Sequence, residues 1–413
     1  MENSELTGRP LRKQGSPPET AIALCAVGAE KVVSNELRKL DLKVEDSFFG
    51  RVRFKADTAG LYKALMGLRA ADRVLLEAGF FRAEDFEALF EGTGAVSWER
   101  LVPKGTGLTV VKVRSNRSRL MAETSIQAVV HKAAAERLCR RYKLARLPED
   151  GAAAEVRVYV EKDMVSLLLD LSGEPLFKRG YRSEGGIAPL RETTAAAMLL
   201  LSGWKRKFPL YDPFCGSGTI MTEAAMYAWD MAPGLNRRFA LNRFLIADPE
   251  IEEAVRKELR AKINFERLVR IAGSDEEGRA VSIAQSNIAR LGDLAEGKTP
   301  VRGIRPAGPE TRRGMTGLSE LKILPIAKAR SPFAGDTGFI ITNPPYGKRL
   351  GDQAASERIY GEMAALRKGF PGWKLALITD HSGFETFFGK KADSCREISN
   401  GAIPSFFFQY EVL

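Results

Sequence analysis

The chain has 413 residues, of which 44% are hydrophobic and 28% are charged. This composition is typical of a soluble, folded protein and argues against a largely disordered or fibrous chain. The length predicts two or three domains with ample core. No uninterrupted run of about eighteen apolar residues exists, so we expect no membrane span. Residues 1–18 are polar and lack the apolar stretch of a secretory signal.

Cysteine and histidine are scarce. The four cysteines lie far apart with no C-x-x-C pair, and there are only two histidines. We therefore expect no disulfide scaffold, no metal site and a reducing, cytoplasmic location.

The net charge of +11 is concentrated in one stretch. Arg100 to Arg146 holds twelve Lys or Arg residues and two acids, and twelve minus two is +10. Such clustering favours a polyanionic partner, although a solvated, solubilising surface is the alternative interpretation. The candidate RNA-binding residues are Lys112, Arg114, Arg117, Arg119, Lys132, Arg137, Arg140 and Arg141.

In chain order, the first half alternates irregularly between strand and helix patterns. We expect strands over 21–25, 48–54, 73–81, 108–113, 155–160 and 164–170. We expect helices over 30–40, 58–66, 82–90 and 121–142, the last of them amphipathic and basic. This order predicts an α+β region with antiparallel sheet.

From Thr193 onward, long helical patterns separate short apolar strands, which predicts a doubly wound parallel sheet. The final segment, 405–412, alternates like the last antiparallel pair of such a sheet. Residues 297–317 are rich in Gly, Pro and Arg without periodicity, and we interpret them as a surface insertion.

A glycine-rich turn follows the strand that ends at Asp212. The segment DPFCGSGTI, 212–220, places a G-x-G turn between a strand and a helix, as in the nucleotide-cofactor sites of α/β sheets. It lacks the third glycine of a dinucleotide fingerprint and the G-K-[ST] of an ATP loop. A carboxylate before the glycines suits a ligand with an ammonium group, such as S-adenosylmethionine (SAM). Asp275, with Glu276 beside it, ends the next strand and could accept ribose hydroxyls.

The second motif is Asn343-Pro344-Pro345-Tyr346, at the end of the apolar strand pattern 339–342. An exocyclic amine on a base is a poor nucleophile because its lone pair is delocalised. The Asn343 oxygen and the Pro344 carbonyl can accept the two N–H bonds and direct the lone pair at a sulfonium methyl group. Tyr346 can stack on the ring. Catalysis would then be mainly positioning, without a strong base.

Further motifs make the chain similar to a known family. They are FKRGYR at 177–182, APLRET at 188–193, APGLNR at 232–237, NPPYGKRLGD at 343–352 and Asn400-Gly401. Together with the glycine loop they resemble the bacterial THUMP-containing 23S ribosomal RNA guanine-N2 methyltransferases. The resemblance implies a ferredoxin-like segment at 20–68, a THUMP RNA-binding domain at 69–172, a linker at 173–190 and a Rossmann-like SAM domain at 191–413.

The resemblance also assigns site residues. Those implied to hold SAM are Ala188, Pro189, Leu190, Asp212, Phe214, Gly216, Ser217, Gly218, Thr219, Asp275, Glu276 and Asn343. Asn343 to Tyr346 are implied to hold the guanine amine. The chain departs from the family near the adenine, where Lys328 stands in the stretch that usually carries an acid.

The function predicted from the sequence is therefore methylation of the N2 amine of a guanosine in large-subunit ribosomal RNA. A transfer RNA guanosine is one alternative, and adenine N6 in a nucleic acid is another, because Asn-Pro-Pro-Tyr serves several planar amines. A non-catalytic ribosome-assembly factor with a degenerate cofactor site is the alternative outside enzymes.

Overall fold

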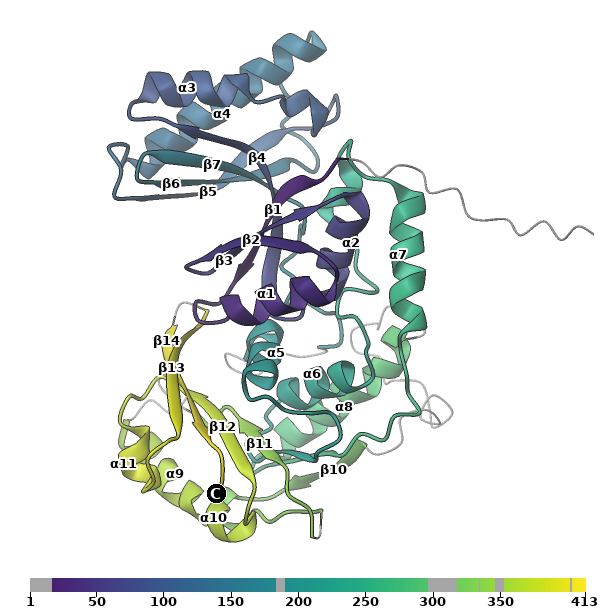
Figure 1. Cartoon of the computed structure of the whole chain (residues 1–413), viewed down its shortest axis with the longest axis vertical. Helices are drawn as coiled ribbons and strands as arrows, with labels where there is room; N and C mark the ends of the chain where they lie inside the picture. Colours follow the sequence, from purple (N-terminus) through teal and green to yellow (C-terminus); the bar gives the residue numbers. More distant parts are fainter. Residues whose placement is uncertain (1–16, 183–189, 296–317, 334, 346–352, 402) are drawn as a thin grey trace, which may run out of the picture.

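A computed structural model describes residues 17–182, 190–295, 318–333, 335–345, 353–401 and 403–413. Two seven-stranded sheets, one in each half of the chain, organise the fold (Figure 1). No helix among these residues is long and apolar enough to cross a membrane.

The first sheet begins with a β-α-β-β-α-β unit. Its strands are β1 (Glu19–Cys25), β2 (Lys43–Phe48), β3 (Arg51–Ala56) and β4 (Ala71–Arg82), with helices α1 (Glu30–Lys39) and α2 (Thr58–Gly67). The spatial order β2-β3-β1-β4 is antiparallel throughout, which is the ferredoxin-like arrangement. Asp57 caps α2 by accepting a hydrogen bond from the Gly60 amide at 2.7 Å.

The sheet continues beyond β4 into a second unit. This unit holds β5 (Leu108–Asn116), β6 (Ala154–Glu161) and β7 (Met164–Asp170), with α3 (Phe86–Ala95), the 3-10 turn η1 (Trp98–Arg100) and α4 (Glu123–Tyr142). The first half of β4 pairs with β1 and its second half with β7, so one long strand serves both units. The predicted division at residues 68 and 69 stays a prediction.

Two sequence expectations were wrong in this half. The pattern over 48–54 is a hairpin, not one strand: β2 and β3 meet at Gly50, whose φ of +70° favours glycine. The helix expected at 82–90 begins at Phe86, because Asp85 caps it by accepting from the Ala88 amide at 2.8 Å.

The second sheet has the order β10-β9-β8-β11-β12-β14-β13, and all its pairings are parallel except those of β14. The predicted doubly wound fold is confirmed, with its switch point at β8. The strands are β8 (Leu210–Asp212), β9 (Ile271–Asp275), β10 (Leu318–Ile323), β11 (Phe339–Thr342), β12 (Lys374–Thr379), β13 (Ser394–Asn400) and β14 (Ile403–Tyr410).

Helices cover both faces of this sheet. One group is α5 (Glu192–Leu201), α6 (Thr219–Ala228) and α8 (Gly278–Ala295); the other is α9 (Gln353–Glu362), α10 (Leu366–Gly369) and α11 (Phe384–Phe388). Helix α7 (Pro249–Ala261) packs instead against α2 of the first sheet's ferredoxin-like unit (Figure 1). The described residues of this half also form the 3-10 turns η2 (Ala240–Arg243), η4 (Ile326–Lys328) and η6 (Met363–Ala365). The aromatic cluster around Trp373, Phe384 and Phe388 forms the core beneath the second group.

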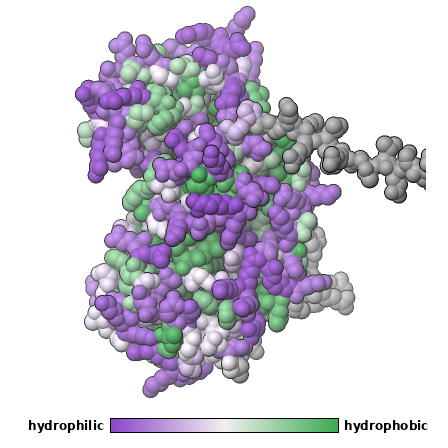
Figure 2. All heavy atoms as spheres, in the orientation of Figure 1, coloured by the Kyte–Doolittle hydropathy of each residue, from purple (hydrophilic) through white to green (hydrophobic). Residues whose placement is uncertain are grey.

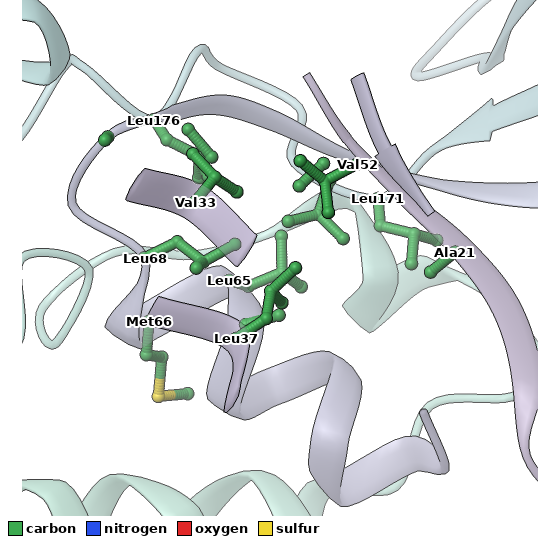
Figure 3. Close-up of a cluster of buried hydrophobic side chains, with 14 of the residues drawn as sticks. Ala21, Val33, Leu37, Val52, Leu65, Met66, Leu68, Leu171 and Leu176 are labelled. Carbon is green, nitrogen blue, oxygen red and sulfur yellow. The ribbon is translucent and has the colours of Figure 1, made fainter. Parts of the chain in front are cut away.

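The two halves share a continuous hydrophobic core. Figure 3 shows Val33, Leu37 and Leu65 of the first unit close to Leu171 and Leu176, which follow β7. Buried polar groups also connect the halves. Arg179, from the FKRGYR motif, donates to the Leu176 and Arg69 carbonyls and pairs with Glu223 of α6, both side chains being at most 1% exposed. The motif therefore joins the halves.

The APGLNR motif forms another connection. The Gly234 amide donates to the Met66 carbonyl at 2.8 Å, and a Cβ at Gly234 would lie 2.7 Å from the Leu65 carbonyl oxygen and 2.8 Å from the Met66 Cα. These contacts are backbone atoms of α2 that cannot rotate away. The position therefore requires glycine for close approach of the chains.

We expect Gly234→Ala to lower the free energy of unfolding by about 1–3 kcal/mol, because the new methyl group has no room. The control is Gly94→Ala in α3, where a Cβ has no neighbour within 4 Å and helix propensity predicts a gain of roughly 0.5–1 kcal/mol. Urea unfolding measures both. Equal stability of the two variants would contradict the packing at the junction.

Candidate active site

Asp212 is the buried centre of the site. It ends β8 at the switch point and is 1% exposed. Its Oδ1 accepts hydrogen bonds from Thr342 Oγ1 at 2.7 Å and from the Phe214 amide at 3.2 Å. Burial raises the pKa of this carboxyl to about 7, more than the Thr342 and Phe214 hydrogen bonds lower it, and the nearby charge of Asp275 adds to the rise. A cationic ligand group would stabilise the ionised form.

The glycine loop turns sharply between β8 and α6. Gly216 and Gly218 have φ values of +50° and +76°, where a side chain is strained. A Cβ at Gly218 would also lie 2.9 Å from the Cβ of Ala284 in α8, whereas the space beside Gly216 is open. The carbonyl of Ser217 accepts from Asn287 at 2.9 Å, and its hydroxyl lies 3.3 Å from that of Thr219. The loop is thus held from α8 and open at Gly216.

Asp275, at the end of β9, lies beside this loop. Its Oδ2 accepts from the Gly216 amide at 2.9 Å, which fixes the carboxylate at the cofactor edge of the sheet. Glu276 next to it is exposed. Lys328, in the stretch expected near the adenine, is also exposed and lies in η4. Ile323, at the end of β10, is a 64% exposed apolar side chain at the same edge.

Asn343 follows β11 and is 8% exposed. Its Oδ1 is buried and has no hydrogen-bond partner among the described residues. Pro344 is buried and Pro345 half-buried, while Tyr346 lies outside the described residues. Thr342, the residue before Asn343, donates a hydrogen bond to Asp212. Asn343 therefore directly follows the residue that contacts the carboxyl at the start of the glycine loop. An unpaired buried acceptor is costly, so this oxygen is expected to receive a donor from a ligand.

The linker contributes Leu190, which is buried; Ala188 and Pro189 lie outside the described residues. Arg182 is a candidate site residue that was not among those predicted from the sequence. It donates to the Leu190 carbonyl at 3.0 Å, to Thr219 at 3.2 Å and to Glu192 at 2.9 Å. Its Nη1 is buried without a partner among the described residues. Its place in FKRGYR was the only available signal.

Cys215, in the glycine loop, is a buried thiol. Burial, with the charges of Asp212 and Asp275, holds its pKa well above the usual value. A thiol that stays protonated is a poor nucleophile, which agrees with a packing role.

The predicted RNA-binding residues fall on two sides of the first sheet. Lys112 projects from β5 on the face opposite the body of α4 and aligns with Arg157 of β6. Arg114, also on β5, forms an ion pair with Glu123 at the start of α4 at 2.9 Å. On α4, Lys132, Arg140 and Arg141 are exposed, whereas Arg137 forms a two-pronged ion pair with Glu99 at 2.7 and 3.1 Å. Arg117 is exposed, and Arg119 pairs with Glu84. One flat duplex surface therefore cannot contact all eight. In Figure 2, hydrophilic residues are prominent at this upper end of the molecule.

The described residues contain no group of three His, Cys, Asp or Glu side chains arranged to hold a metal ion. The groups that could hold a cofactor are the Asp212 carboxyl, the open side of Gly216, the Asp275 carboxylate and the unpartnered Asn343 and Arg182 atoms. An ammonium, a ribose and a carboxylate each find a partner of suitable chemistry among them. They fit SAM.

Comparison with known proteins supports this chemistry. A family model described as an RMKL-like methyltransferase domain matches residues 179–297 and 313–407, and one described as an RlmL ferredoxin-like domain matches residues 20–75. The chain belongs to the RMKL-like methyltransferase family. The matched segments contain both the glycine loop and Asn343.

Full-length relatives share this architecture. A Bacillus subtilis (strain 168) protein named "Putative RNA methyltransferase YpsC" is 34% identical over 397 residues, which are 95% of each chain. The structure of SMU.472 complexed with SAH has a TM-score of 0.82 at 34% identity, covering 96% of this chain and 99% of that one. A Listeria monocytogenes structure described as a "predicted N6-adenine-specific DNA methylase" has a TM-score of 0.81 at 33% identity, covering 95% and 96%.

The raised pKa of Asp212 has a measurable effect on stability. An acid with a folded pKa near 7 and an unfolded pKa near 3.8 destabilises the fold progressively as pH rises from about 4 to about 7. Asp212→Asn keeps a hydrogen-bond acceptor for Thr342 and removes the charge. We expect it to raise the free energy of unfolding of the cofactor-free protein at pH 8 by up to about 4 kcal/mol. The gain should vanish near pH 4.

Urea unfolding at several pH values measures this difference. Asp275→Asn is the control, because Asp275 is only half-buried and the same neutralisation there should give no comparable gain. A constant difference between wild type and Asp212→Asn from pH 4 to pH 8 would contradict a buried, titrating Asp212.

Proposed function

We propose that this protein is a SAM-dependent methyltransferase that modifies the N2 amine of a guanosine in 23S ribosomal RNA, in the cytoplasm. The observation that carries the proposal is the buried Oδ1 of Asn343, to which no described residue donates a hydrogen bond and which lies one residue from the Thr342–Asp212 hydrogen bond. An acceptor in that position suits a donor on the substrate, and an exocyclic amine offers two N–H groups.

SAM supplies a methyl group activated by its sulfonium. Asp212 would hold the ammonium group of this cofactor, and Asp275 would hold its ribose hydroxyls. The cofactor would approach the backbone most closely at Gly216. Arg182 would meet the carboxylate through its Nη1, which has no hydrogen-bond partner in the described part of the chain. The remaining assigned residues, Ala188 to Leu190, Phe214, Ser217, Gly218, Thr219 and Glu276, would complete the surroundings.

Asn343 and the Pro344 carbonyl would act on the acceptor amine. By accepting both N–H bonds they orient the nitrogen lone pair toward the methyl group, and Tyr346 would stack on the base. Buried hydrogen bonds to a reacting group are strong because water is excluded. The proton leaves after methyl transfer, when the nitrogen is acidic, so the site needs no strong base. Cys215 takes no part.

The choice of RNA rests on charge and on relatives. The stretch 100–146 carries +10, and the B. subtilis relative is named as an RNA methyltransferase. We propose that the unit containing β5, α4, β6 and β7 is a THUMP domain that binds RNA, within the predicted range 69–172. Lys112 and Arg114 would contact one part of the RNA, and Lys132, Arg140 and Arg141 another. A base inside a duplex must be flipped or unpaired to reach Asn343.

Product analysis tests the reaction directly. The full chain is incubated with methyl-labelled SAM and, separately, with 23S ribosomal RNA, transfer RNA and DNA, and each product is digested to nucleosides. We expect N2-methylguanosine from 23S ribosomal RNA, at least tenfold above the other two substrates.

The other outcomes discriminate among the alternatives. If N2-methylguanosine forms mainly in transfer RNA, the assigned substrate changes to transfer RNA and the assigned reaction stays the same. Labelled N6-methyladenine, the product that the name of the L. monocytogenes relative, a "predicted N6-adenine-specific DNA methylase", would imply, would overturn the guanine assignment. RNA binding without SAM binding by calorimetry would indicate a non-catalytic assembly factor.

A further inference from the structure

An arginine-lined cavity lies at the junction of the two halves, formed partly by the APGLNR segment. Its volume is about 740 Å³. Its walls come from the start of the linker, from the loop after α6 with η2, and from α7. The charged lining residues are Glu174, Arg237, Arg238, Arg243, Glu252, Arg256 and Arg260. Five arginines and two acids leave a net charge of +3.

Both acids of the wall are already paired. Glu252 accepts from Arg256 at 2.5 Å through one oxygen and from Asn242 at 2.6 Å through the other. Glu174 pairs with Lys178, whose hydrogen bond holds the pKa of that carboxyl below its usual value. Each carboxylate therefore already has a hydrogen-bonded cation, and of the other arginines the charge of Glu174 acts on Arg237.

The remaining four arginines have no carboxylate partner among the described residues. Arg237 is fixed in the wall, donating to the Glu174 and Pro175 carbonyls at 2.7 and 2.9 Å. Burial lowers its pKa to about 10, which still leaves it charged at neutral pH. Arg238 and Arg243 are exposed, and the exposed Arg260 meets only the Asn236 side chain, at 3.4 Å. Three guanidinium groups are thus available to a ligand.

The wall that presents these groups is hydrogen-bonded to the first half of the chain through its backbone. The Leu241 amide donates to the Leu171 carbonyl at 3.0 Å, and the Leu245 amide to the Leu101 carbonyl at 2.9 Å. The segment between α6 and α7 is therefore hydrogen-bonded to the unit that contains β5, α4, β6 and β7, and also to α2. Guanidinium groups held on a fixed, concave backbone match the geometry of phosphate oxygens.

We propose that this cavity binds phosphate groups of the RNA backbone through Arg238, Arg243 and Arg260. The inference rests on the proposed function, since it supplies a contact for the same RNA between its basic unit and the catalytic sheet. An RNA backbone and a small phosphorylated molecule offer the same group, a phosphate, to these arginines. RNA is favoured because the cavity lies at the junction between the proposed RNA-binding unit, which contains β5, α4, β6 and β7, and the sheet that carries the candidate active site.

The test is the triple variant Arg238→Ala, Arg243→Ala, Arg260→Ala in the full chain. Its control is Lys205→Ala, Lys368→Ala, Lys391→Ala, which removes the same charge from exposed positions outside the cavity. Filter binding of 23S ribosomal RNA is measured from 0.05 to 0.3 M salt. We expect the cavity variant to bind at least tenfold more weakly at 0.15 M salt, with a salt slope reduced by about 2–3. The control should stay within about threefold of wild type.

Two further readouts complete the design. Affinity for S-adenosylhomocysteine should be unchanged in both variants, which shows that they fold. Pyrophosphate is titrated in a thermal-shift assay: stabilisation of wild type but not of the cavity variant, with RNA affinity unaltered, would overturn the assignment to RNA and identify a small phosphorylated ligand. No effect in either assay would overturn the site altogether. If the cavity variant loses RNA affinity as expected but wild type forms no methylated nucleoside, the proposed reaction is wrong and the proposed phosphate site is still supported.

Discussion

The hydrogen bond from Thr342 to the buried carboxyl of Asp212 joins residues 130 positions apart and determines what the second sheet can do. It holds the carboxyl end of β11 against that of β8, at the point where the strand order reverses. The glycine loop follows one of these strands and Asn343 follows the other. Cofactor and acceptor groups are therefore brought together by sheet topology, before any ligand is bound.

The fold accepts an electrostatic cost at this point. Asp212 is fully desolvated, with Asp275 nearby, and its ionised form is disfavoured until a cation arrives. Asn343 carries a buried oxygen without a partner among the described residues. Polar groups left incomplete in the folded protein are expected where a ligand completes them. The exposed arginines of the junction cavity are also polar groups that a ligand would complete, in their case an anionic one.

Local signals in the sequence predicted much of this arrangement. Strand and helix periodicities gave the doubly wound sheet, and the two motifs indicated the loops at its edge. Thr342 could not be assigned from the sequence, because its role depends on β11 lying beside β8. The two-sided distribution of the basic residues was equally hidden, since only the pairing of β5 with β6 shows that Lys112 and Lys132 face apart. Gly50 and Asp85 are residues typical of a turn and of a helix cap. The predictions at 48–54 and 82–90 followed the hydrophobic periodicity instead, and they were wrong.

In the proposed reaction the Asn343 carboxamide holds the acceptor amine. The most direct measurement is the single-turnover rate of Asn343→Ala with saturating SAM and RNA, with Asn343→Asp as a variant that keeps an acceptor oxygen. The account predicts a rate at least 100-fold below wild type for alanine, partial retention for aspartate and unchanged affinity for SAM. A rate for Asn343→Ala equal to that of wild type would contradict it.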